Sequence, residues 1–252
     1  MAHLKIANLN VSGGFYIGNE DTEYLDRAAV DSIDDKLLNQ IIDFINTKDL
    51  DLICFQEIIT TEDVKYIQTL TEKTPLKYAE SFELSECNIV KDTRCGVAIL
   101  SKYPLSVIKK ELFPNPKLSK TTSSGNTYYT YDKGYLLCEV NLDNQKLAVM
   151  THHGFPFRRF NSSPEANPAI FSFFDEAISS QNPDIITGDF NADDFMSLMP
   201  HTNANYIRTI NKVTTVDGHK FDDILLRKNT AFASDIVKIL SDHYLVIADV
   251  AL

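Results

Sequence analysis

The sequence predicts an α/β fold in which layered sheets are flanked by helices. Short runs rich in Val, Ile, Leu and Tyr, which are typical of strands, recur near both ends of the chain. Helical patterns lie between the early strands and again before residue 185. Because helices that alternate with strands cover the faces of sheets, we expect one layered α/β domain over residues 1–252. This length would also allow two small domains, but no repeat or linker-like segment divides the chain.

Eight segments carry the strand pattern, and three carry apolar residues at the spacing of a helix face. The expected strands are residues 5–11, 52–56, 97–100, 135–141, 146–151, 185–187, 223–226 and 245–250. The first helix should contain residues 37–45, with Asp34 or Asp35 as its N-cap. Val64, Ile67 and Leu70 indicate a second helix, and residues 169–177 a third that begins near Pro168.

Residues 114–133 are polar and rich in Ser, Thr and Asn, so we expect a long surface loop there. Three tyrosines lie within it: Tyr128, Tyr129 and Tyr131. They could stack on the bases of a nucleic acid, or they could pack the loop onto the body of the protein.

The charge balance excludes a protein that coats nucleic acid with a basic surface. Lys and Arg total 24 and Asp and Glu total 35, which leaves a net charge of −11. An enzyme that contacts phosphates locally, or through a divalent metal ion, remains possible. The longest apolar runs are far shorter than the ~18 residues of a membrane-spanning helix. With no Trp and no amphipathic hairpin, we expect no stable membrane insertion.

The cysteines and the first residues indicate a compartment only weakly. Cys54 and Cys138 lie in strand-like runs and should be buried thiols, whereas Cys87 and Cys95 could either pair or stay reduced. The chain opens with a strand-like run rather than the pattern of a signal peptide. We therefore expect a cytoplasmic monomer, or a secreted protein if a leader has been removed.

Polar residues of the metal-binding type repeatedly stand at the ends of the expected strands: Asn10, Glu57, His152, His153, Asp189, Asn191, Asp222, Asp242 and His243. Strand ends are rigid and can converge at one edge of a sheet. Carboxylate and amide oxygens suit Mg²⁺ or Mn²⁺, and imidazoles suit proton transfer. The set therefore indicates metal-assisted hydrolysis of a phosphoester. Each residue alone could be a turn or structural residue, but the ordered set argues against that and against a catalytically inactive binding module.

The ordered segments resemble the endonuclease/exonuclease/phosphatase superfamily of metal-dependent phosphodiesterases. They are LKIANLN (4–10), FQE (55–57), GVAILSKYPL (96–105), THHG (151–154), GDFNAD (188–193), FDDILL (221–226) and SDHYLV (241–246). Several of them are most similar to pancreatic-type deoxyribonucleases, while GVAILSKYPL is closer to the wider family. The resemblance implies a four-layer α/β/β/α sandwich of two packed mixed sheets, with the active site at one end.

The resemblance also implies roles for individual residues. Asn10, Glu57 and Asp242 look like ligands of a Mg²⁺ or Mn²⁺ ion. His243 resembles the catalytic imidazole, oriented by Asp222. Asp189 resembles the carboxylate that orients or activates water, with Asn191 binding phosphate or metal beside it.

Another family histidine contacts the scissile phosphate. Either His152 or His153 could fill this role, and we assign it to His152, which directly follows Thr151. Ser12 replaces an acidic residue found in some family nucleases, which favours a single metal ion.

Three arginines could bind phosphates of the substrate. Arg94 matches a segment that often supplies a basic phosphate contact in the family, and Arg158 and Arg159 follow the two histidines. All three could equally be solvated surface residues. The substrate expected from these features is a nucleic acid, cut internally or processed at an end. An inositol phosphate, a nucleotide or a sphingolipid is the alternative.

Overall fold

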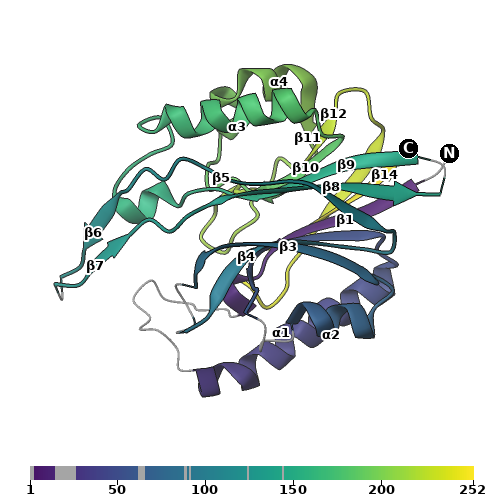
Figure 1. Cartoon of the computed structure of the whole chain (residues 1–252), viewed down its shortest axis with the longest axis horizontal. Helices are drawn as coiled ribbons and strands as arrows, with labels where there is room; N and C mark the ends of the chain where they lie inside the picture. Colours follow the sequence, from purple (N-terminus) through teal and green to yellow (C-terminus); the bar gives the residue numbers. More distant parts are fainter. Residues whose placement is uncertain are drawn as a thin grey trace.

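Two six-stranded mixed sheets pack face to face (Figure 1) in the computed structural model, which describes residues 3–14, 27–61, 66–87, 90, 92–123, 125–143 and 145–252. The first sheet has the order β13-β14-β1-β2-β4-β3. Its strands are β1 (His3–Asn10), β2 (Leu52–Ile59), β3 (Tyr78–Glu86), β4 (Arg94–Ser101), β13 (Phe232–Val237) and β14 (Leu245–Ala251). β1 runs parallel to β2 and antiparallel to β14.

The second sheet has the order β11-β12-β10-β9-β8-β5. Its strands are β5 (Leu105–Leu112), β8 (Gly134–Leu142), β9 (Gln145–His153), β10 (Ile185–Asp189), β11 (Tyr206–Arg208) and β12 (Asp222–Arg227). β9 and β10 are parallel, so both end at the same edge, where the antiparallel β12 begins.

Helices cover the outer face of each sheet and complete the four layers (Figure 1). α1 (Arg27–Lys48) and α2 (Tyr66–Lys73) pack on the first sheet, and α3 (Pro168–Gln181) and α4 (Pro200–Asn205) on the second. The described residues also form three short 3-10 helices: η1 (Ser12–Gly14), η2 (Phe157–Phe160) and η3 (Phe195–Leu198). None of the described helices is long and apolar enough to cross a membrane.

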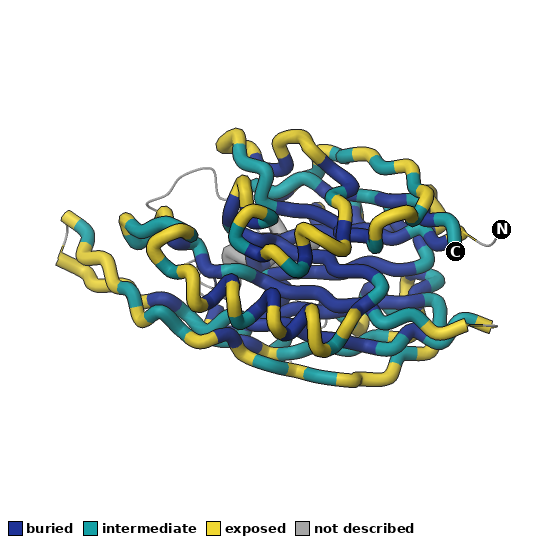
Figure 2. Tube along the Cα trace, turned by 90° about the horizontal axis from the view of Figure 1, so that it is seen from above, coloured by how far each residue is buried: buried dark blue, intermediate teal, exposed yellow. Residues whose placement is uncertain are grey.

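The central strands are apolar over much of their length because both of their faces are buried (Figure 2). Leu52 and Cys54 face the other sheet, whereas Ile53 and Phe55 face α1. The eight strands expected from the sequence are therefore present, in β1, β2, β4, β8, β9, β10, β12 and β14.

Other expectations need correction. α1 begins at Arg27, so Asp34 and Asp35 lie within the helix and are not its cap. The expected loop 114–133 contains a hairpin of β6 (Ser119–Thr121) and β7 (Thr127–Tyr129). Val64 lies outside the described residues, while Ile67 and Leu70 lie in α2 as expected. None of the four cysteines forms a disulfide, and all four are buried.

Candidate active site

The strand ends that carry polar residues meet at one edge of the sandwich, across the seam between the two sheets. The Nδ2 of Asn10, at the end of β1, donates to Asp189 Oδ2 at the end of β10, 3.0 Å away. Beneath this bond, Gln56 Nε2 donates to Asn8 Oδ1 at 2.8 Å and to Thr151 Oγ1 of the other sheet at 3.0 Å. These buried side chains fix the register of the two sheets at the site.

Glu57 owes its position to a β-bulge. The pairing of β2 with β4 shifts between Gln56 and Ile58, and Glu57 has a φ of 55°. A non-glycine residue adopts this left-handed conformation only at a cost, and bulges of this kind re-aim a side chain next to an active site. Here the bulge brings Glu57 Oε1 within 3.4 Å of both Asn10 Nδ2 and His153 Nε2.

The structure brings His153, not His152, into this cluster. The parallel register pairs His153 with Asp189 and His152 with Gly188, so the two rings point to opposite faces of the sheet. His153 Nε2 lies 3.4 Å from Glu57 Oε1 and 3.5 Å from Asp189 Oδ2. Burial, followed by the charge of Lys133, holds the pKa of His153 well below its ordinary value.

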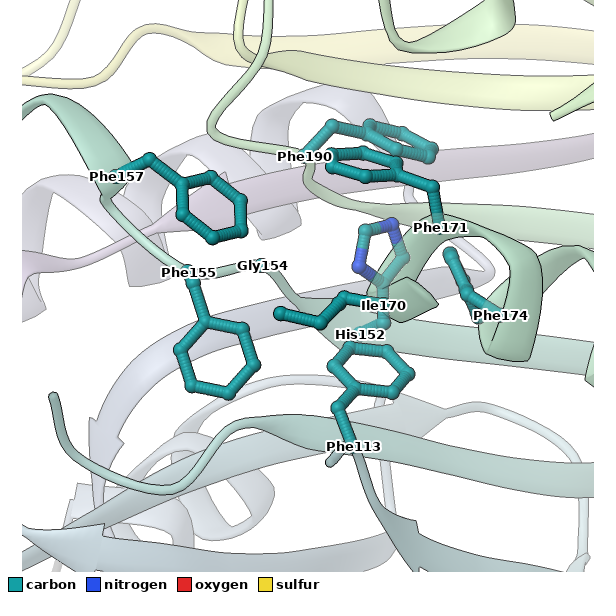
Figure 3. A pocket seen from close by; sticks show the side chains of 9 residues that line it. All are labelled: Phe113, His152, Gly154, Phe155, Phe157, Ile170, Phe171, Phe174 and Phe190. Carbon is teal, nitrogen blue, oxygen red and sulfur yellow. The ribbon is translucent and has the colours of Figure 1, made fainter. Parts of the chain in front are cut away.

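His152 points away from the cluster into an aromatic pocket beneath α3 (Figure 3). Its ring centroid lies 4.4 Å from that of Phe174 and 4.2 Å from that of Phe190. Both ring nitrogens are buried with no hydrogen-bond partner among the described residues, and burial lowers the pKa of His152 to about 3. The cavity beside it measures about 20 Å³ and is apolar, which is room for one water molecule rather than for a substrate.

The sequence analysis missed Lys133, which lies in the cluster. Its Nζ is 3.0 Å from Nδ1 and 3.3 Å from Nε2 of His153, and its carbonyl accepts a hydrogen bond from Phe113 N. Burial lowers the pKa of Lys133, while the charge of Glu57 acts in the opposite direction. A single lysine in a polar segment gives no signal in a sequence. It becomes apparent only in the structure, where Lys133 directly precedes β8 and the first residue of β8 pairs with His153.

His243 lies between two carboxylates. Its Nδ1 is hydrogen-bonded to Asp222 Oδ2 at 2.8 Å, and its Nε2 lies 3.9 Å from Asp189 Oδ2. Burial acts to lower the pKa of His243, but the charges of Asp222 and Asp189 raise it well above its ordinary value. The same burial raises the pKa of Asp189 to about 7, with a contribution from Asp222. An imidazole in this setting holds its proton and is fixed in orientation.

Asn191 fixes the orientation of Asp189. Its backbone N donates to Asp189 Oδ1 at 2.8 Å, and its Nδ2 donates to Asp189 Oδ2 at 3.1 Å and to Gly154 O at 3.2 Å. Its φ of 50° allows both contacts from one residue. With its amide group engaged in this way, Asn191 supports Asp189.

Carboxylate and amide oxygens that could serve as metal ligands are concentrated at this edge, and they suit a hard divalent cation. Burial raises the pKa of Asp242, the charge of His243 lowers it, and the negative charge of Glu57 raises it. A cation beside the two carboxylates would offset their like charges. Asp189, Asp222 and His243 also offer ligand atoms within 4.8 Å of one another, but the raised pKa of His243 disfavours a metal ion on its ring.

The three arginines occupy two different settings. Arg94 forms an ion pair with Glu83 of the neighbouring strand, with 2.9 Å between Nε and Oε1. Arg158 and Arg159 are exposed on η2, just after β9. The charge of Arg159 acts to lower the pKa of Lys133, His153 and Asp242.

Comparisons with known proteins agree with this architecture. The profile of the Endonuclease/Exonuclease/phosphatase family matches residues 7–243. An endonuclease/exonuclease/phosphatase from Bacteroides vulgatus has a TM-score of 0.61 and 16% identity, with 100% of both chains covered. D. rerio TDP2, humanized by 14 mutations, has a TM-score of 0.64 and 18% identity over 99% of both chains. Sphingomyelinase C from Streptomyces griseocarneus has a TM-score of 0.61 and 14% identity over 100% of both. No curated protein sequence matches the chain.

Proposed function

The chain belongs to the endonuclease/exonuclease/phosphatase family, whose members hydrolyse phosphoester bonds, and we propose that it is a divalent-metal-dependent phosphodiesterase that acts on nucleic acid. The observation that carries this proposal is the ring of His243, held between Asp222 and Asp189 at an edge rich in oxygen donors. An oriented imidazole beside such donors meets the needs of phosphoester hydrolysis.

We assign the metal ion, Mg²⁺ or Mn²⁺, to Asn10, Glu57 and Asp242. When bound, the ion would polarise a phosphoryl oxygen and neutralise charge on the leaving oxygen. The like charges of Glu57 and the half-buried Asp242 support this assignment. The bulge at Glu57 supports it too, because a strained backbone that aims one carboxylate into the cluster has a cost that a structural role would not require.

The remaining residues would position water and handle protons. Asp189, with both oxygens held by Asn10 and Asn191, is suited to orient water and accept its proton, and a pKa of about 7 suits a general base near neutral pH. His243 would donate a hydrogen bond to the phosphate, with Asp222 fixing its tautomer.

A second group would face the phosphate from β8 and β9. We transfer to His153 the role that the sequence assigned to His152, because His153 is the histidine beside Glu57 and Asp189. Lys133 supplies a cation at the same place, which suits a non-bridging phosphate oxygen. Arg94 already pairs with Glu83, so Lys133 takes over the phosphate contact expected of Arg94.

Cleavage of supercoiled plasmid tests the proposal. With Mg²⁺ or Mn²⁺ we expect nicking that EDTA and His243→Ala each abolish, while the circular dichroism spectrum of the folded variant is unchanged. A folded His243→Ala variant that nicks like the wild type would refute the role of His243. Metal-dependent hydrolysis of bis(p-nitrophenyl) phosphate without nicking would support metal-dependent phosphoester hydrolysis. It would also indicate that the substrate is a small or lipid phosphoester rather than a nucleic acid.

A further inference from the structure

The β6–β7 hairpin is an arm that extends past the body of the sandwich (Figures 1 and 2). It lies on the side opposite the chain termini, the same edge at which the end of β1 places the candidate site. All six of its strand residues are exposed, and its two strands form a separate sheet. An isolated two-stranded hairpin is marginally stable in water, so an arm of this kind needs support at its base.

The base of the arm is held by hydrogen bonds and leads directly into the site. Asn115 Nδ2 donates to Thr130 O at 3.0 Å and to Asp132 Oδ1 at 2.8 Å, and Thr130 Oγ1 donates to Asn115 Oδ1 at 2.7 Å. The next residue is Lys133, beside His153. The arm is therefore a supported extension of the wall of the site.

The arm is locally basic in an acidic protein. Residues 114–131 contain Lys117 and Lys120 and no Asp or Glu, whereas the whole chain has a net charge of −11. β6 contacts η2, which carries the exposed Arg158 and Arg159. Positive charge thus continues from the site along the arm, which suits a polyanion with several phosphates.

The arm also presents aromatic rings. Tyr128 is 43% exposed and Tyr129 is 65% exposed. The register places Tyr128 directly opposite Lys120, so a ring and an ammonium group share one face of the hairpin. Of the two alternatives that the sequence left open for these tyrosines, exposure favours contact with a ligand over packing onto the body.

Resting on the proposed function, we propose that the arm binds single-stranded nucleic acid and leads it to the site. Lys120 would contact a phosphate, and Tyr128, on the same face of the hairpin, would stack on a base. A single strand is favoured over a duplex because its bases leave their faces free for stacking. The turn at the tip reads TTSSGNT over residues 121–127 and has no apolar side chain to insert into a membrane.

The test compares two matched double variants. Lys120→Ser/Tyr128→Ser alters the arm, and Lys77→Ser/Tyr78→Ser is the control. Tyr78 is 44% exposed, and it pairs with Ser101 at the end of the first sheet opposite the site. Both doubles are made in the His243→Ala background, so that binding of a labelled 20-nucleotide strand can be measured by fluorescence anisotropy without cleavage.

We expect the arm variant to raise the Kd for the strand roughly tenfold, and the control to leave it within twofold. The slope of log Kd against log salt should also fall by about 0.7, for one lost phosphate contact on a single strand. Equal Kd values for the two doubles would overturn the proposal, as would tighter binding of a duplex of the same length or of anionic lipid vesicles.

Activity of the same doubles with an intact His243 separates this proposal from the proposed function. Hydrolysis of bis(p-nitrophenyl) phosphate should be the same in wild type, arm variant and control, because this ester does not reach the arm. If the wild type does not hydrolyse this ester or the nucleic acid, the proposed function fails. If it cleaves both and the arm variant has an unchanged KM for the strand, only the role of the arm fails.

Discussion

At the scale of single residues, His152 and His153 show how strand alternation separates two identical side chains. One ring reaches Glu57 and Asp189, and the other packs against Phe174 and Phe190. We expect His153→Leu to reduce phosphoester hydrolysis by at least about a hundredfold, the lower end for loss of a group that stabilises charge in the transition state. The matched variant His152→Leu should retain activity, and initial rates on the two folded proteins measure the contrast. Full activity in His153→Leu would return the role to His152.

His152 should also affect the stability of the fold in acid. Because burial lowers the pKa of His152 to about 3, the folded protein binds fewer protons than the unfolded chain between pH 6.5 and pH 3. Stability therefore falls as the pH drops through this window. His152→Leu removes this loss. The free energy of unfolding of the variant, minus that of the wild type, should therefore be about 3 kcal/mol higher at pH 4 than at pH 7. Urea unfolding at both pH values tests this, and a pH-independent difference would contradict it.

Asp222 is expected to act through His243. The carboxylate raises the pKa of His243, so the fold gains stability that is complete below pH 6.5 and is lost as the pH rises through the raised pKa. In Asp222→Asn, the pKa of His243 should move down towards 6.5, as NMR titration of the metal-free protein would show. Activity should fall less than in His243→Ala, because Asp222 only orients the ring. An unchanged pKa of His243 would exclude this coupling.

The sequence indicates which types of residue form the site more readily than it indicates which side chains point into it. Polar residues at the ends of apolar strands are unusual, and this singled out Asn10, Glu57, Asp189, Asp222 and His243. The choice between His152 and His153 needs the exact register of β9 against β10, which a sequence of two adjacent histidines does not contain. Lys133 could not be found, since its neighbour His153 lies on another strand.

At the scale of elements, burial decides which strands can be recognised. The central strands contain long apolar runs because both of their faces are covered, so they stand out in the sequence. β3, β5 and β13 lie at sheet edges and are largely half-buried or exposed, and their mixed composition hides them. The arm escaped prediction for the same reason, because none of its strand residues is buried.

The pairing of β11 with β12 contains an ion pair whose loss should be costly. Arg208 Nε lies 2.6 Å from Asp223 Oδ2, and the Asp223 side chain is 0% exposed. Arg208→Ala would leave a buried charge without its partner and should lower the unfolding free energy by about 3–5 kcal/mol at pH 8. Burial raises the pKa of Asp223 to about 6 even though Arg208 lowers it, so in the variant the carboxyl should become protonated at a higher pH. The cost should therefore shrink as the pH falls towards 6.

Arg227 provides the control for this measurement. It pairs with Asp184 at 3.4 Å, but the two side chains are 34% and 38% exposed, so Arg227→Ala should cost less than about 1 kcal/mol from the ion pair. Urea unfolding at pH 8 and pH 5 compares the two variants. Similar losses in both would mean that burial does not govern these pairs.

At the scale of the whole molecule, the protein has a net charge of −11, and several of its carboxylates lie together at the edge that forms the candidate site. A divalent ion bound there should stabilise the folded protein, because it binds the folded state and not the unfolded chain. We expect millimolar Mg²⁺ to raise the Tm of the wild type and to have a smaller effect on Glu57→Gln, as measured by calorimetry at constant ionic strength. An equal rise in both proteins would reject Glu57 as a ligand.

The hydrogen bond between Asn10 and Asp189 has a consequence for how the protein folds. The two residues are 179 positions apart, and Ser241 Oγ donates to the carbonyl of Asn10 across 231 positions. Closing loops of this length is slow compared with forming a single helix or hairpin. During refolding, secondary structure should therefore return before enzymatic activity, and the first turnover would mark the moment at which both ends of the chain have docked.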